Sequence, residues 1–212
     1  MGEIPEKARP RDVKGLIAPG LRLGLAGPYR GGLRFLLWTG AKPDHLTVAS
    51  LVANVVVAVL LTRGFRSLPA GLLLLSGVLD VFDGAVARAR GISSARGAWF
   101  DSVMDRVSDA LVLGALFYSL LVQGRSVDAA LALSALGISL LVSQVRAEAE
   151  SRGAKLSEGA FARAERFIVL VIGLWAPGAL RYALIVLAGL GAFTIVQRTI
   201  AARAALTRIE SS

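Results

Sequence analysis

From Asp80 to Asp105 the chain reads DVFDGAVARARGISSARGAWFDSVMD, which places four aspartates in a region otherwise apolar enough to lie in a membrane. Charged side chains at bilayer depth are costly, and they usually face a cavity or a partner and mark a functional pathway. Four neighbouring carboxylates also need positive charge close by. This stretch therefore predicts both a membrane-embedded fold and a place where chemistry occurs.

The composition of the whole chain supports a membrane protein. The 212 residues are 55% hydrophobic, and the mean hydropathy of +0.63 exceeds that of an ordinary soluble domain. Cysteine is absent, so disulfides, thiolate metal sites and cysteine nucleophiles are excluded. The net charge of +9 comes from basic residues at the ends of apolar segments. This distribution indicates contacts with anionic membrane lipids and argues against a nucleic-acid partner.

Hydropathy divides the chain into six expected membrane spans, since a helix crossing the hydrocarbon core needs roughly 20 apolar residues. We expect these spans at Leu46–Thr62, Leu68 to about Arg88, about Gly97 to Gln123, Val127–Val145, Phe161–Trp175 and Leu180 to about Ala201. Residues 1–42 interleave Arg with Leu, Phe and Trp, which predicts an interfacial amphipathic segment. The sequence thus indicates an all-α integral membrane protein, with a six-helix transmembrane domain over residues 43–212.

Basic residues are distributed unevenly between the two ends of these spans. One side collects the basic residues of segments 7–42, 88–96, 146–166 and 198–208. The other side has Arg63, Arg66, Arg125 and Arg181. Because cytoplasmic loops near span ends carry an excess of Lys and Arg, we expect a multi-pass protein of the cell membrane whose termini and acidic site face the cytoplasm.

The four aspartates are spaced to face one another from two helices. Asp80 and Asp83 are three positions apart on one expected span, and Asp101 and Asp105 are four apart on the next, so each pair shares a helix face. A tight loop between the spans brings both pairs to the cytosolic edge of the bilayer. Oxygen ligands without His or Cys suit hard divalent cations, so we expect Mg²⁺, with Mn²⁺ as an alternative, and two ions that hold a pyrophosphate.

Small and basic residues accompany the acidic group. Gly84, Ala87 and Gly97 leave room for a phosphate or a base near the backbone, and Arg88 offers a guanidinium fork to phosphate oxygens. Any one of the aspartates alone is more simply explained as a helix cap, but capping does not require this whole pattern. Asp109, one turn further along, fits either an extension of the acidic group or a hydrogen-bonded structural acid.

The pattern D-x-x-D-G-x-x-A-R from Asp80 to Arg88, followed after eight residues by G-x-x-x-D-x-x-x-D from Gly97 to Asp105, resembles the complete signature of the CDP-alcohol phosphotransferase family. The resemblance implies a membrane enzyme, commonly a homodimer, that transfers a phosphate-linked group from a CDP-linked donor, often CDP-diacylglycerol, to an alcohol and releases CMP. It also implies that the four signature aspartates bind metal and that Asp105 is the catalytic base.

The same resemblance implies which residues bind the CDP-linked donor. Gly84 and Arg88 would contact the nucleotide diphosphate. Asp44 and Thr47 belong to a Pro-Asp-x-x-Thr turn that touches the nucleotide in relatives using inositol phosphate, and Ser94 occupies a further polar position of the motif loop. The residues that we expect around the donor are therefore Asp44, Thr47, Gly84, Ala87, Arg88, Ser94 and Gly97.

A basic loop before the fifth expected span indicates a phosphorylated acceptor, because Arg clusters recognise phosphate. Arg146, Arg163 and Arg166 would flank the acidic group, with Arg198 at the end of the last span, although each Arg is about equally well explained as a positive-inside charge. The candidates for the acceptor phosphate are Arg146, Arg163 and Arg198.

Three shorter motifs resemble the phosphatidylinositol-phosphate synthases within this family: DRVSD from Asp105, RAEA from Arg146 and ARAERFI from Ala162. These enzymes usually carry a Tyr and then a Lys or Arg just before RAEA, where this chain has Val142 and Gln144. We therefore expect transfer of a phosphatidyl or similar lipid-phosphate group to inositol phosphate, with glycerol phosphate as the alternative acceptor. A divalent-cation transporter is a distant alternative, because acidic residues in spans also form ion paths.

Overall fold

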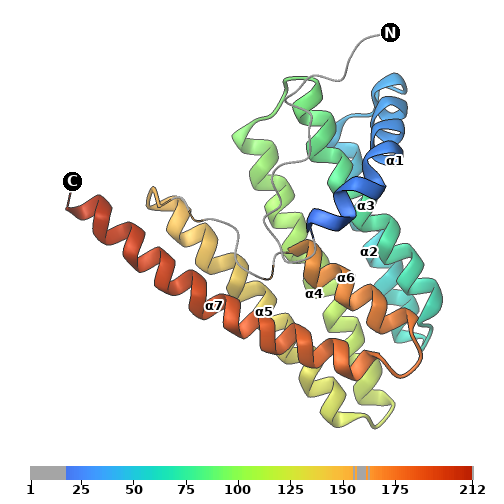
Figure 1. Ribbon diagram of the computed structural model, residues 1–212. Helices are drawn as coiled ribbons and strands as arrows, with labels where there is room; N and C mark the ends of the chain where they lie inside the picture. The colour runs from blue at the N-terminus through green and yellow to red at the C-terminus, as the bar shows by residue number, and fades with distance from the viewer. Residues whose placement is uncertain (1–17, 155, 157–160, 162, 212) are drawn as a thin grey trace.

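The computed structural model describes residues 18–154, 156, 161 and 163–211. The first 17 residues of the expected interfacial segment lie outside these described residues. Within these residues the secondary structure is helical, and the connections whose residues are all described are short (Figure 1). The helices are α1 (Ala18–Trp38), α2 (Pro43–Thr62), α3 (Ser67–Ala89), α4 (Ala95–Val122), α5 (Ser126–Ser151), α6 (Arg163–Trp175) and α7 (Leu180–Glu210).

Four helices in the described part of the chain, α2, α3, α5 and α7, are long and apolar enough to cross a membrane. α6 has 13 residues, which is about 20 Å of helix and shorter than a hydrocarbon core of about 30 Å. α4 has 28 residues, but charged residues crowd its first four turns, namely Arg96, Asp101, Asp105, Arg106 and Asp109. The expectation of an all-helical chain with several membrane-length helices is confirmed, while the number of six spans stays a prediction.

Local sequence explains where the helices around the acidic motif begin and end. Pro43 occupies the first turn of α2, where its fixed φ suits the helix and its missing N–H costs nothing. After α3, Gly91 adopts a φ of 68°, a left-handed conformation that glycine takes without strain. The side chain of Ser94 then caps α4 by accepting a hydrogen bond from the amide of Gly97 at 3.0 Å.

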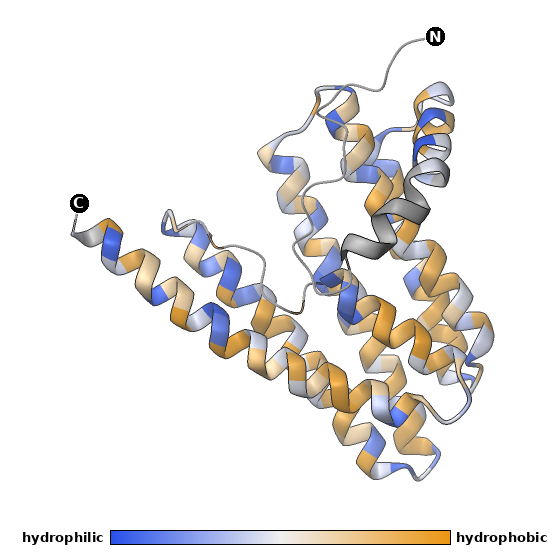
Figure 2. Cartoon of the chain, in the orientation of Figure 1, coloured by the Kyte–Doolittle hydropathy of each residue, from blue (hydrophilic) through white to orange (hydrophobic). Residues whose placement is uncertain are grey.

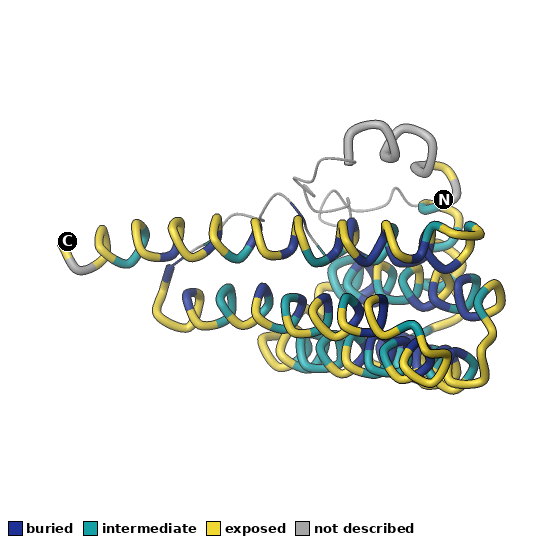
Figure 3. Tube along the Cα trace, turned by 90° about the horizontal axis from the view of Figure 1, so that it is seen from below, coloured by how far each residue is buried: buried dark blue, intermediate teal, exposed yellow. Residues whose placement is uncertain are grey.

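Most of the buried apolar residues form one large core cluster, and two smaller clusters lie apart from it. α2 packs against α3 and α4, α5 lies between α4 and α7, and α6 closes the bundle against α3 and α7 (Figure 1). Val57, Leu73, Leu116 and Leu184 are fully or almost fully buried in the shared core. α5 and α7 run side by side and extend beyond the other helices (Figures 1 and 3).

Hydrophobic residues dominate the lower part of the helices, and hydrophilic residues gather around the last turns of α3 and the first turns of α4 (Figure 2). The acidic motif lies at this polar end. α1 packs against α3 beside the motif: Leu33 is buried, and the ring of Tyr29 stacks on Phe82 at a centroid distance of 5.5 Å. Phe35 and Trp38 of α1 stay exposed, as expected for a helix at a membrane interface.

Candidate functional site

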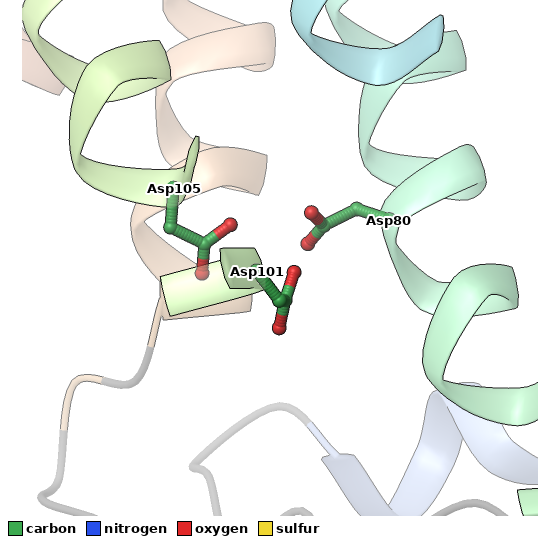
Figure 4. A group of neighbouring side chains, drawn as sticks. All are labelled: Asp80, Asp101 and Asp105. Carbon is green, nitrogen blue, oxygen red and sulfur yellow. The ribbon is translucent and has the colours of Figure 1, made fainter. Parts of the chain in front are cut away.

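Three of the four signature aspartates converge in the structure. Asp80 extends from α3, and Asp101 and Asp105 extend from neighbouring turns of α4, so that their carboxylates point toward one another (Figure 4). One carboxylate oxygen from each residue lies within 4.8 Å of the others. All three residues are partly buried at the polar end of the bundle. We call these three residues the carboxylate cluster.

The carboxylate cluster suits a hard divalent cation. Its ligand atoms are carboxylate oxygens, which Mg²⁺ and Mn²⁺ prefer over nitrogen and sulfur. Two opposite ligands of an octahedral Mg²⁺ stand about 4.2 Å apart, and the three carboxylate oxygens of the cluster lie within 4.8 Å of one another. The cluster is therefore compact enough for its carboxylates to share a cation.

Asp83, the fourth expected metal ligand, has a different contact. Its Oδ2 accepts a hydrogen bond of 2.7 Å from the hydroxyl of Thr47 on α2, and both residues are buried. Asp83 lies one turn after Asp80 on α3, so its carboxylate adds negative charge beside the cluster without belonging to it. Thr47, expected near the donor, thus orients an acidic residue of the signature.

The positive charge that the acidic motif requires comes from α6. Nη1 of Arg163 lies 3.0 Å from Oδ2 of Asp80 and also forms an ion pair with Oδ1 of Asp105. Nη2 of Arg163 lies 3.9 Å from Oδ1 of Asp109. One guanidinium therefore contacts acidic residues of two helices, and it joins α6 to the α3–α4 pair.

The glycines of the motif make close approaches to polar atoms. A Cβ at Gly84 would stand 3.0 Å from Nη1 of Arg88, so the lack of a side chain lets the guanidinium lie along α3. A Cβ at Gly97 would stand 3.2 Å from Oγ of Ser94, which caps α4. Ala87 is partly buried in the last turn of α3, and in the sequence it lies between Gly84 and Gly97.

The remaining predicted residues lie in other surroundings. Asp44 is exposed in the first turn of α2. Arg146 pairs with Glu150 one turn along α5 at 2.8 Å, and the buried Arg198 donates to the carbonyl of Val142 at 2.9 Å, which joins α7 to α5. Of the three expected acceptor residues, Arg163 is the one that contacts the carboxylate cluster.

A small cavity of about 40 Å³, lined by both apolar and polar side chains, lies beside Arg163. Among its lining residues are the polar side chains of Asn54, Ser108, Asp109, Ser139, Arg163 and Arg166. Asn54, Ser108 and Ser139 were not among the site residues predicted from the sequence. Their signal was a polar residue inside an apolar span, which in a membrane protein usually faces the interior of the bundle.

Comparison with known proteins agrees with the motif. Residues 41–203 match the family model described as CDP-alcohol phosphatidyltransferase. The chain is 37% identical over 162 residues to the archaetidylinositol phosphate synthase of Methanothermobacter thermautotrophicus, covering 74% of this chain and 80% of that protein. It is 34% identical over 174 residues to the phosphatidylinositol phosphate synthase of Corynebacterium glutamicum, covering 76% and 77%.

The fold also matches solved structures. The crystal structure of the phosphatidylinositol phosphate synthase of Mycobacterium tuberculosis with CDP-DAG bound has a TM-score of 0.74 at 29% identity, covering 82% of this chain and 92% of that one. A second structure of that enzyme, in complex with manganese and citrate, also has a TM-score of 0.74, at 29% identity, and covers 82% and 88%.

The chain belongs to the CDP-alcohol phosphatidyltransferase family. The family predicted from the signature between Asp80 and Asp105 is therefore confirmed, and the protein is a membrane transferase of phospholipid biosynthesis. This membership also removes the reason for treating the acidic residues as the path of a cation transporter.

Proposed function

We propose that this enzyme transfers a phosphatidyl or similar lipid-phosphate group from a CDP-linked lipid, such as CDP-diacylglycerol, to a hydroxyl of inositol phosphate. The observation that carries the proposal is the convergence of Asp80, Asp101 and Asp105 with the guanidinium of Arg163 at the polar end of the bundle. The inositol phosphate synthases among its relatives support the acceptor, and the CDP-DAG complex of a structural neighbour supports the donor.

The carboxylate cluster would hold the divalent metal, Mg²⁺ first and Mn²⁺ as an alternative, with two ions per site and Asp83 as a further ligand. When bound, the metal neutralises the diphosphate and the charge that develops on the departing CMP. The manganese complex of a structural neighbour supports a divalent ion in this family.

The reaction would form one bond and break one bond at the phosphorus nearer the lipid. The acceptor oxygen bonds to this phosphorus, and the anhydride bond to CMP breaks with its electron pair leaving on CMP. The acceptor hydroxyl must lose its proton, and Asp105 would take it as general base. Its carboxylate lies among the other charged groups of the site, which fits this role.

The donor would lie along the end of α3 and the start of α4. Arg88 would bind its diphosphate next to Gly84, where a larger side chain would push the Arg88 guanidinium, 3.0 Å from a Cβ at that position, out of its place. Other donor contacts would come from the neighbouring positions of α2, α3 and the loop to α4, namely Asp44, Thr47, Ala87, Ser94 and Gly97.

The acceptor phosphate would bind to Arg163, which already stands beside the carboxylates. Arg146 and Arg198 would complete this subsite by turning from their present partners, Glu150 and the carbonyl of Val142. A phosphate between these guanidiniums would be held by charge-assisted hydrogen bonds, which are stronger than those between neutral groups.

The membrane arrangement is part of the proposal. Residues 1–42 would form an interfacial segment, and residues 43–212 a six-span domain with both termini and the site facing the cytoplasm of the cell. The exposed Phe35 and Trp38 on α1 support the interfacial placement. We also propose a homodimer, as is common in this family.

An acceptor panel tests the proposal. Purified protein is given CDP-diacylglycerol, Mg²⁺ and, in separate reactions, inositol phosphate, glycerol 3-phosphate, inositol or serine. We expect CMP release together with a phosphatidylinositol phosphate product in the inositol phosphate reaction. If a product forms only with glycerol 3-phosphate, the acceptor is glycerol phosphate and not inositol phosphate. If turnover occurs only with an unphosphorylated alcohol, the proposed subsite for the acceptor phosphate is wrong.

A further inference from the structure

Asp109 of α4 contacts residues of α5 and α6 and lies outside the carboxylate cluster. It lies one turn after Asp105 on α4, and its Oδ2 accepts a hydrogen bond from the hydroxyl of Ser139 on α5. Its other oxygen, Oδ1, faces Nη2 of Arg163 on α6 at 3.9 Å. Ser139 therefore fixes the Asp109 carboxylate so that one oxygen stays directed at Arg163.

Arg163 and a metal ion compete for the same two carboxylates. Nη1 of Arg163 contacts Oδ2 of Asp80 and Oδ1 of Asp105, both residues of the carboxylate cluster. A divalent cation that coordinates these carboxylates neutralises negative charge that the guanidinium contacts, and the two positive charges repel strongly in a partly buried site. A bound cation therefore requires the Arg163 guanidinium to shift.

Asp109 offers the place for that shift. A movement of about 1 Å brings Nη2 of Arg163 from 3.9 Å to the length of a charge-assisted hydrogen bond with Asp109, near 2.8 Å. The cavity of about 40 Å³ is lined by both residues and leaves space on that side. The displaced guanidinium would then stay beside the site, where an acceptor phosphate arrives.

We infer that Asp109, oriented by Ser139, is a positioning residue that retains the Arg163 guanidinium next to the carboxylate cluster when a divalent cation binds there. The inference rests on the proposed function, because it assumes that the cluster binds metal. It assigns a task to an aspartate that is not among the four of the signature between Asp80 and Asp105.

A double-mutant cycle on metal binding tests this role, since coupling energies separate contacts from independent effects. Mn²⁺ affinity is measured by isothermal titration calorimetry and by the electron paramagnetic resonance of free Mn²⁺, on the full chain in detergent. The variants are Asp109→Asn, Arg163→Gln and the double variant, with Ser108→Ala as the control because Ser108 lines the same cavity.

We expect Asp109→Asn to weaken Mn²⁺ binding about tenfold, within the range of coupling between contacting residues. In the Arg163→Gln background, the same substitution should change the affinity less than about twofold, because no guanidinium remains to be held. Equal weakening in both backgrounds would overturn the inference, since Asp109 would then act only as a nearby negative charge.

Ser139→Ala is a second test that does not depend on the stability of the Arg163 variant. It alters no charge, so it weakens Mn²⁺ binding only if the orientation of Asp109 matters, and an unchanged affinity would contradict the inference. The proposed function fails in a different way: the unaltered protein would then show no saturable Mn²⁺ binding, or Asp101→Asn would leave that binding unchanged.

Discussion

Thr47 of α2 donates a 2.7 Å hydrogen bond to the carboxylate of Asp83 on α3, across 36 positions of sequence. Both residues are at least 94% buried, with exposed fractions of 6% and 5%. Thr47 Oγ1 also lies 3.3 Å from the carbonyl of Pro43, in the first turn of its own helix. The start of α2 is thereby tied to the acidic motif, because the hydroxyl that satisfies Asp83 stands in a fixed place.

Thr47→Val should remove this bond while keeping the shape of the side chain. A hydrogen bond to a charged group contributes about 1.5–3 kcal/mol, so we expect lower thermal stability in detergent and a slower release of CMP. Thr47→Ser keeps the hydroxyl and should retain most of both properties. The prediction is wrong if the Val and Ser variants behave alike.

Asp101→Asn should abolish metal-dependent activity, because it removes one of the three converging carboxylates. We expect CMP release to fall by more than about 100-fold and Mn²⁺ affinity to fall with it. Glu148→Gln is the matched control, since this exposed carboxylate pairs with Arg152 on the surface of α5. An Asp101→Asn variant that keeps Mn²⁺ affinity and turnover would exclude this aspartate as a metal ligand.

Gly84→Ala should raise the KM for the CDP-linked donor without unfolding the protein. The new Cβ would come within 3.0 Å of Nη1 of Arg88, the mobile end of a long side chain, which must move aside. We expect an increase of about three- to tenfold, the equivalent of one weakened hydrogen bond. Gly137→Ala is the control, because a Cβ at Gly137 meets no atom within 4 Å. An unchanged KM in the Gly84 variant would argue against a donor site there.

Asp128→Asn should lower the melting temperature by several degrees and leave the KM values unchanged. Asp128 is fully buried near the start of α5, where Oδ1 accepts from Nε of Arg181 at 2.6 Å and Oδ2 accepts from Nε of Arg125 at 2.8 Å. The substitution leaves both guanidiniums without this carboxylate and loosens α7 from α5. Arg63→Gln, an exposed change outside these contacts, should have little effect. Equal melting temperatures for Asp128→Asn and the unaltered protein would show that these contacts of Asp128 do not stabilise the fold.

The sequence by itself determined the helices and the acidic pattern. The expected spans from Leu46, Leu68 and Leu180 correspond to α2, α3 and α7, because runs of apolar residues define membrane helices wherever they occur. α7 continues to Glu210, beyond the expected end near Ala201, since helical propensity continues after the apolar run ends. The spacing of Asp101 and Asp105 fixed their common face, since a helix turns by a constant angle per residue.

Only the tertiary structure decided which helix faces meet. In the folded protein Asp83 contacts Thr47, whereas Asp80 lies with the carboxylates of α4. Arg163 contacts Asp80 although the two residues are 83 positions apart in the sequence. Such contacts depend on how each helix is rotated about its axis against its neighbours. That rotation is set by side-chain packing across the whole bundle, which no local spacing in the sequence encodes.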